Sequence, residues 1–76
     1  MTRSGETANP ITVVVNGRPR DVPDQETVAG LVASSGLGDR AIAIEINGQL
    51  VPGSQFAETR LRPADQIEIV SLAGGG

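Results

Sequence analysis

Residues 41–52 have the sequence AIAIEINGQLVP, and this stretch contains the clearest strand signal of the chain. Isoleucine alternates with alanine or glutamate over residues 42–46, which is the two-residue period of a half-buried β-strand. The Asn47-Gly48 pair that follows suits the two positive-φ positions of a type I′ hairpin turn. Residues 49–51 are therefore expected to return and pair with the strand.

The same arrangement occurs near the start of the chain. Residues 11–15, ITVVV, are β-branched and typical of a strand. They are followed by Asn16-Gly17, and residues 18–22 are expected to form the returning strand. Pro19 places that returning strand at a sheet edge, because proline cannot donate a ladder hydrogen bond.

A short helix is predicted between the two hairpins. Thr27 is the expected N-cap, with Asp24 as the alternative, and Gly36 is expected just past the C-terminus. A helix of about two turns is stable only when it packs on other structure. Its apolar stripe comprises Val28, Leu31, Val32 and, as a further candidate, Leu37.

The remaining segments predict a short helical turn over 55–58 with Phe56 buried, an edge strand over 59–61 and a last strand over 66–72. Strongly apolar first and last strands favour a central parallel pair joined by a crossover helix. We therefore predict an α+β fold of the β-grasp (ubiquitin-like) class, a mixed sheet of four to five strands with one main helix on one face. The chain divides into a disordered leader (1–10), the β-grasp domain (11–72) and a flexible glycine tail (73–76).

Alternation assigns the apolar residues to two faces of this sheet. The helix is expected to cover the face formed by Ile11, Val13, Val15, Ile42, Ile44, Ile46, Ile67 and Ile69. An exposed apolar patch rimmed by Glu45, Glu68 and Arg62 then remains on the other face, and it is either ordinary surface or a docking site. The expected partner-binding residues are Val14, Ala43, Val70 and Leu72.

Composition excludes most catalytic chemistry. The 76 residues contain no His, Cys, Trp or Tyr, so Cys–His pairs, Ser–His–Asp triads and Cys/His zinc sites are impossible. A chain of this length is also not expected to form an enzyme cleft of about 300–1,000 Å³. We expect no bound metal or cofactor, and we expect a protein that partner enzymes act on.

Charge and hydrophobicity narrow the range of partners and locations. The net charge is −3, with six scattered arginines, no lysine and a single aromatic residue, so a nucleic-acid-binding surface is not predicted. No apolar run approaches the length of a membrane span, and residues 1–10 lack the apolar centre of a signal peptide. Without cysteines to form disulfides, the cytoplasm is the expected location.

Three glycines, Gly74, Gly75 and Gly76, end the chain directly after the last predicted strand. A frayed terminus is the simple interpretation. Alternatively, a segment without side chains can enter a narrow channel and present its terminal carboxylate to a partner's active site. Adenylation with ATP would activate the Gly76 carboxylate, and attack by a persulfide would lead to a thiocarboxylate.

The sequence resembles the ThiS family of sulfur carriers in thiamine biosynthesis. The resemblance rests on ITVVVNGRPRDV (11–22), TVAGLVASSGL (27–37), AIAIEINGQLVPGSQF (41–56) and LRPADQIEIVSLAGGG (61–76). It implies a β-grasp fold and adenylation of Gly76 by a ThiF-type enzyme that uses ATP and magnesium. It further implies sulfur from a cysteine desulfurase or another donor, and thiazole synthase (ThiG) as the acceptor of that sulfur.

Other functions fit the same tail. The related MoaD carriers of molybdopterin synthesis often have proline before the final glycines, and residues 70–73 have none. Carriers for cysteine or natural-product synthesis, a protein modifier joined through Gly76, and an inert β-grasp interaction module are the further alternatives.

Overall fold

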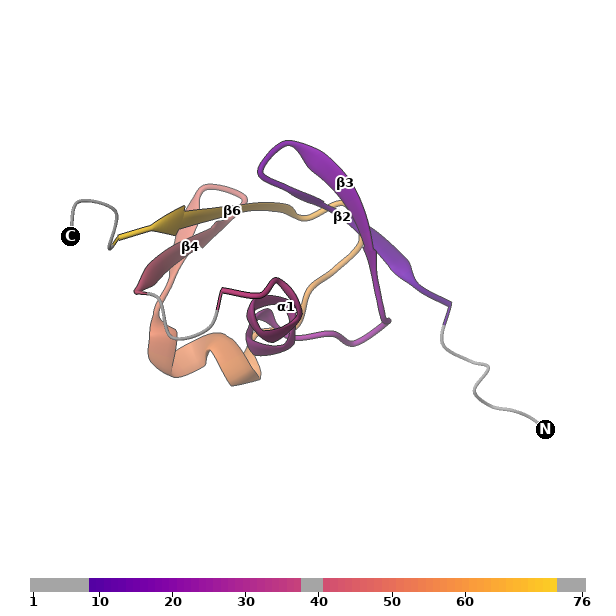
Figure 1. Ribbon diagram of the computed structural model, residues 1–76. Coiled ribbons are helices and arrows are strands. Elements are labelled where there is room, and N and C mark those ends of the chain that lie inside the picture. The colour runs from indigo at the N-terminus through magenta and orange to yellow at the C-terminus, as the bar shows by residue number, and fades with distance from the viewer. Residues whose placement is uncertain (1–8, 38–40, 73–76) are drawn as a thin grey trace.

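The computed structural model describes residues 9–37 and 41–72 (Figure 1). The predicted tail, and all but two residues of the predicted leader, therefore lie outside the described residues. The elements, in chain order, are β2 (Ile11–Val15), β3 (Arg18–Val22), α1 (Val28–Ser34), β4 (Ile42–Ile46), β5 (Gln49–Val51), the 3₁₀ helix η1 (Gly53–Glu58) and β6 (Gln66–Ser71).

The strands form one mixed five-stranded sheet in the order β3-β2-β6-β4-β5. The first and last strands are parallel, with Val15 opposite Ile67, and the other neighbouring pairs are antiparallel. Helix α1 lies against one face of the sheet (Figure 1). The β-grasp prediction, with its central parallel pair and single main helix, is confirmed.

Both hairpin turns have the backbone that their sequences predict. Asn16 and Gly17 have φ values of 51° and 85°, and Asn47 and Gly48 have 53° and 84°. Two successive positive φ angles define the type I′ turn, whose twist matches that of the flanking strands. Each turn thus fixes the register of its hairpin, because a slip by one residue would move every side chain to the wrong face.

The asparagine side chains of these two turns also hold β6 in place. The amide N–H of Ile69 donates to Oδ1 of Asn16 at 2.8 Å, and Nδ2 of Asn16 donates to the Ile69 carbonyl at 3.4 Å. On the other side of β6, the amide of Gln66 donates to Oδ1 of Asn47 at 3.0 Å, and Nδ2 of Asn47 donates to Asp65. The last strand is therefore anchored by both hairpins.

Helix α1 begins and ends where the sequence predicts. Thr27 is the N-cap, and its hydroxyl accepts a hydrogen bond from the amide of Gly30 at 3.1 Å, which satisfies one of the free N–H groups of the first turn. Gly36 follows the C-cap with φ of 72°, a value that favours glycine. The helix has only seven residues, so packing on the sheet must supply its stability.

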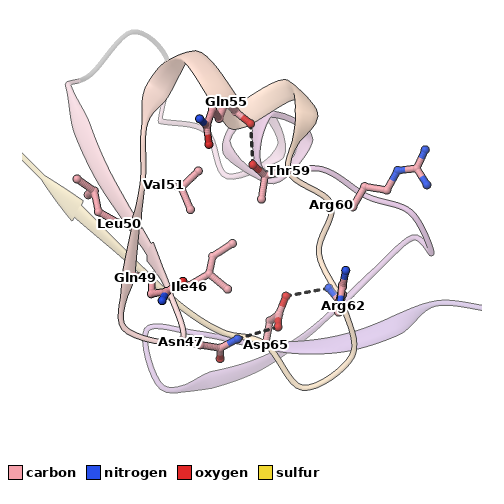
Figure 2. Close-up of a pocket in the computed structure, with 10 residues that line it drawn as sticks. All are labelled: Ile46, Asn47, Gln49, Leu50, Val51, Gln55, Thr59, Arg60, Arg62 and Asp65. Atoms are coloured by element: carbon pink, nitrogen blue, oxygen red, sulfur yellow. Dashed lines mark hydrogen bonds between the residues drawn. The ribbon is translucent and has the colours of Figure 1, made fainter.

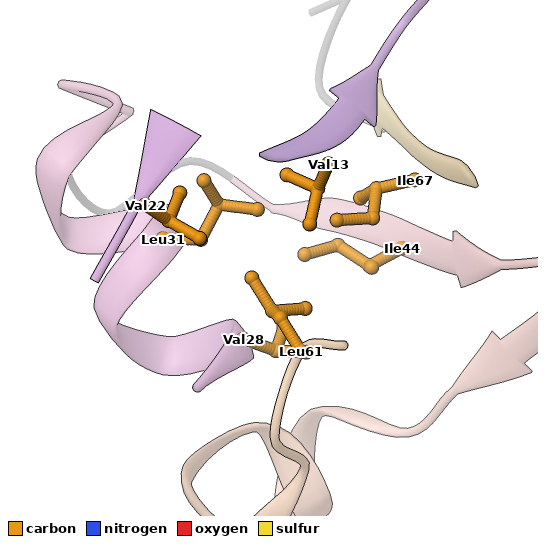
Figure 3. Close-up of a cluster of buried hydrophobic side chains, with 7 residues drawn as sticks. All are labelled: Val13, Val22, Val28, Leu31, Ile44, Leu61 and Ile67. Carbon is orange, nitrogen blue, oxygen red and sulfur yellow. The ribbon is translucent and has the colours of Figure 1, made fainter. Parts of the chain in front are cut away.

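The core lies between α1 and the sheet (Figure 3). Its buried members are Val13, Val22, Val28, Leu31, Ile44, Leu61 and Ile67, and Ile11, Val15, Val32, Ile42, Ile46, Phe56 and Ile69 pack around them half-buried. Each fully buried aliphatic side chain stabilises the fold by about 1.5–3 kcal/mol relative to its exposed state. The predicted helix-facing residues all belong to this set, whereas Val22 and Leu61 are additional.

The edge strand predicted over 59–61 is wrong. This segment makes only an isolated bridge, between Thr27 and Arg60. Its backbone pairs with the residues that enter the helix: the amide of Leu61 donates to Glu26 and the Thr59 carbonyl accepts from the N–H of Val28. Leu61 is thereby turned into the core, and the segment closes one end of it. The helical turn expected over 55–58 is present, although it begins at Gly53.

Candidate functional site

The predicted reactive residue Gly76, and the tail glycines Gly74 and Gly75, lie outside the described residues. The structure does describe the strand that leads to them. β6 is the central strand of the sheet, and its pairing with β4 continues to Leu72, whose amide donates to the Ala41 carbonyl at 2.8 Å. The segment that precedes the tail is therefore fixed in the sheet up to this residue.

The four residues predicted to bind a partner lie on neighbouring strands of the face opposite α1. Val14 is paired with Gln66 of β6, and Ala43 is paired with Val70. Because alternate residues of a strand share a face, Val70 and Leu72 lie on the same side as these two. Val14 and Ala43 are half-buried, whereas Val70 is 52% exposed and Leu72 is 63% exposed.

Leu50 belongs to the same face, although it was not among the predicted residues. It stands opposite Glu45 in the β4–β5 hairpin, so its side chain lies on the side away from α1, where it is 65% exposed. The sequence could have predicted this position of Leu50, because a two-residue turn at Asn47-Gly48 pairs Leu50 with Glu45. We call the five apolar residues Val14, Ala43, Leu50, Val70 and Leu72 the bare face.

Within the described residues, the large exposed hydrophobic side chains are Leu50, Val70 and Leu72, and all of them belong to the bare face. Single exposed apolar residues are normal on a protein surface, but their concentration on one face is typical of an interaction site. The bare face can therefore bury apolar surface against another protein without any change in the core.

Two carboxylates lie on the same side of the sheet as the bare face. Glu45 and Glu68 are directly opposite each other on β4 and β6, and both are exposed. Like charges in this arrangement destabilise a sheet, so the pair does not contribute to folding. Arg62, predicted to lie at the rim with them, is instead in the loop before β6 and lines a pocket beside β5.

This pocket has a volume of about 420 Å³ and opens between β5, η1 and the loop before β6 (Figure 2). A chain of this length was predicted to have no hollow of this size, and that prediction is wrong. Ile46 and Val51 provide apolar lining, and the remaining lining residues are Asn47, Gln49, Leu50, Gln55, Thr59, Arg60, Arg62 and Asp65.

Several polar groups of the pocket are already hydrogen-bonded to the fold. The carboxylate of Asp65 accepts from the amide of Arg62 at 2.8 Å and from Nδ2 of Asn47 at 3.1 Å. The Thr59 hydroxyl donates to the Gln55 carbonyl, and the Arg60 side chain points away from the hollow (Figure 2). The contacts of Asp65 stabilise the turn before β6, and that of Thr59 stabilises the end of η1. We assign no chemistry to the pocket.

Comparison with known proteins identifies the family. The model of the ThiS family matches residues 13–76, which include the bare face and the whole glycine tail. The chain belongs to the ThiS family of ubiquitin-like sulfur carriers. This membership supports a role as a sulfur carrier in thiamine biosynthesis.

The fold is similar to the crystal structure of the thiamine biosynthesis protein ThiS from Geobacter metallireducens. It superimposes with a TM-score of 0.74 at 25% sequence identity, over 87% of this chain and 100% of that chain. The likeness confirms the β-grasp architecture.

Two curated relatives differ in length. A thiazole synthase from Paramagnetospirillum magneticum (strain ATCC 700264 / AMB-1) is 36% identical over 64 residues, which are 84% of this chain but only 20% of that protein. The uncharacterized protein ycf40 of Porphyra purpurea is 32% identical over 66 residues, 87% of this chain and 93% of that one. This ThiS-family chain thus spans about a fifth of the first relative and nearly all of the second.

Localisation was expected to be cytoplasmic. Within residues 9–37 and 41–72, no helix is long and apolar enough to cross a lipid bilayer.

Proposed function

We propose that this chain is a sulfur carrier whose Gly76 carboxylate is adenylated and converted to a thiocarboxylate. The observation that carries the proposal is the ThiS-family match, which continues through the last residue, Gly76. The chain acts in this scheme as a co-substrate, because the partner enzymes supply the catalytic groups together with ATP and magnesium.

The chemistry requires activation because a carboxylate is a poor electrophile. An oxygen of the Gly76 carboxylate attacks the α-phosphorus of ATP and pyrophosphate leaves, which gives an acyl adenylate. The terminal sulfur of a persulfide, supplied by a cysteine desulfurase or another donor, then attacks the carbonyl carbon and AMP leaves. A thiol cleaves the resulting acyl disulfide, so that the Gly76 thiocarboxylate is released and the thiol and the donor sulfur become a disulfide.

The bare face is the proposed docking surface for a ThiF-like adenylating enzyme. Val70 and Leu72 immediately precede the tail in the chain and are 52% and 63% exposed. Docking at these residues would bring the start of the tail to the edge of the partner's active site. Gly74 and Gly75 then allow entry through a narrow channel, because they have no Cβ to collide with its walls.

Thiazole synthase is the proposed acceptor of the sulfur. Support comes from the relatives that carry this name: one from Paramagnetospirillum magneticum matches this chain over 20% of its length, and one from Magnetococcus marinus (strain ATCC BAA-1437 / JCM 17883 / MC-1) matches over 19%. A ThiS-like segment within such proteins would place carrier and acceptor in one polypeptide. We propose that the present chain serves the same reaction.

The direct test is intact-mass spectrometry. The purified chain is incubated with a ThiF-family adenylating enzyme, ATP, magnesium, a cysteine desulfurase, cysteine and a thiol. We expect the mass to rise by the difference between sulfur and oxygen. The matched controls are omission of ATP and a variant that lacks Gly76, and neither should gain mass. An unchanged mass for the intact chain would favour an inert interaction module.

A second variant tests entry of the tail into the partner. Gly75→Val should abolish adenylation, because a β-branched side chain restricts the backbone and fills space that glycine leaves free. The variant should unfold at the same temperature as the parent chain. Normal adenylation kinetics for Gly75→Val would contradict entry through a channel fitted to glycine.

A further inference from the structure

β6 presents its backbone groups alternately to its two neighbours, as any strand within a sheet does. Gln66 and Leu72 face β4: the Gln66 carbonyl accepts from the amide of Asn47, and the amide of Leu72 donates to Ala41, each at 2.8 Å. The register is continuous between these two points. Residues 66, 68, 70 and 72 therefore hydrogen-bond with β4, and residues 67, 69 and 71 face the side of β2.

The pairing on the β2 side ends early. The Ile67 carbonyl accepts from the amide of Asn16 at 2.8 Å, and there β2 turns away into its hairpin. The Asn16 side chain replaces the missing strand for one more residue, because it bonds both the N–H and the carbonyl of Ile69. Ser71 is the next residue on this side.

Ser71 has no neighbour on the β2 side among the described residues. Its N–H and C=O point to the side that β2 has left, and the residue is exposed. In Figure 1 the end of β6 extends past the β2–β3 turn and is flanked by β4 alone. Unpaired strand edges of this kind accept an added strand from another chain.

We propose that an extended segment of the adenylating enzyme pairs with the backbone of Ser71, in the position that β2 leaves open. The inference rests on the proposed function, and it adds a backbone contact between the bare face and the tail. Ser71 lies between Val70 and Leu72 of the bare face, so a partner bound there already has its surface beside this edge. The segment of the enzyme would extend the backbone pairing of β6, on the side that faces β2, by one residue pair.

The occupant is a partner enzyme and not a second copy of this chain. A single exposed residue offers only two backbone hydrogen bonds, each worth roughly a two- to tenfold change in affinity, which is too little to hold two free molecules together. For a partner that already binds the bare face and the tail, the same bonds form within the complex at high effective concentration. Two copies would also bring net charges of −3 together.

Amide hydrogen exchange, followed by NMR, tests the contact directly. In the free chain we expect the Ser71 amide to exchange fast, while the amides of Val70, which faces β4, and Ile69, which bonds Asn16, exchange slowly. Addition of a ThiF-family adenylating enzyme with ATP should slow exchange at Ser71. Unchanged exchange at Ser71 in a complex that forms would overturn the inference and leave the proposed function intact.

Ser71→Pro and Ser71→Ala form a matched pair of variants. Proline removes an N–H that has no acceptor among the described residues, as at other sheet edges, and it also fixes φ and keeps Val70 extended, as it already is in β6. Alanine removes only the hydroxyl. We expect Ser71→Pro to fold and to bind the adenylating enzyme roughly two- to tenfold more weakly than Ser71→Ala, the equivalent of one hydrogen bond. Equal affinity of the two variants would overturn the inference alone. Failure of the unaltered chain to bind would overturn both the inference and the proposed function.

Discussion

The two faces of the sheet are built by the same strands and both carry aliphatic residues, yet their central side chains differ sharply in burial. On the face under α1, Val13, Ile44 and Ile67 are at most 1% exposed, whereas Val70 and Leu72 on the bare face are 52% and 63% exposed. The difference arises because residues 9–37 and 41–72 form one main helix, which covers only one of the two apolar faces. One face therefore stabilises the fold, and the other leaves apolar surface exposed.

Truncation of a buried side chain gives the strongest test of how much each face contributes to stability. Ile67→Ala should lower the free energy of unfolding by about 2–5 kcal/mol, because it removes buried methyl groups and leaves a cavity. Its control on the same strand is Val70→Ala, which should change stability by only about 0.5 kcal/mol. Chemical denaturation measures both. Similar losses of unfolding free energy in the two variants would mean that the bare face also contributes to the stability of the fold.

A charge on each face separates folding from binding. Val70→Asp should reduce affinity for the adenylating enzyme by about 2 kcal/mol, as expected for an anchoring residue in an interface, with little effect on thermal unfolding. Ile69→Asp should instead unfold the domain, because a charge placed among core residues has no partner there. Normal binding by a folded Val70→Asp chain would place the docking surface elsewhere.

The hydrogen bonds of Asn16 can be removed without changing the turn. Asn16→Gly keeps the positive φ that the turn requires and loses the two side-chain bonds to Ile69. We expect the free energy of unfolding to fall by about 1–3 kcal/mol, because two hydrogen bonds of about 0.5–1.5 kcal/mol each are lost. Glycine also loses more conformational entropy on folding than asparagine, which adds to this loss. Faster hydrogen exchange at the Ile69 amide would show that the loss of stability is located at β6.

Loss of the N-cap of α1, the helix that covers the buried face of the sheet, should reduce stability by a smaller amount. Thr27→Ala removes the acceptor for the Gly30 amide and should cost about 1 kcal/mol. Thr27→Ser retains the hydroxyl and is the matched control. If both variants unfold at the same temperature as the parent chain, the cap does not contribute to keeping the helix on the sheet.

The smallest expected effect is stabilising. Glu68→Gln relieves the repulsion from Glu45 across the bare face and should raise the free energy of unfolding by about 0.2–1 kcal/mol at low salt. The gain should shrink as salt is added, because exposed charges are screened. A destabilised variant would indicate that Glu68 has a favourable contact in the fold.

Local signals were sufficient to predict most of the fold. Asn-Gly pairs specify their own turns, and alternation over residues 42–46 specifies which side chains face the helix, so both hairpins and the core face followed from the sequence. The strand predicted over 59–61 failed because its backbone pairs with the helix entry at Glu26, which is distant in the sequence. The hydrogen bonds between the Asn16 side chain and the Ile69 backbone escaped prediction for the same reason.

The candidate site was predictable to a similar extent. Val14, Ala43, Val70 and Leu72 share one face because alternation requires it, and Leu50 could have been added from the hairpin register. The open edge at Ser71 could not be predicted, because it depends on where β2 stops beside β6. Binding by this face and the reaction at Gly76 remain predictions.

The central position of β6 has a mechanical consequence. β6 is bonded to β4 along its whole length and to β2 at Gln66 and Ile67, so a pull directed along it must shear both rows of hydrogen bonds before the strand leaves the sheet. An edge strand pulled away sideways would instead peel off one bond at a time. A partner could therefore draw the tail into its active site and let it go repeatedly, while the domain resists unravelling from the end on which the force acts.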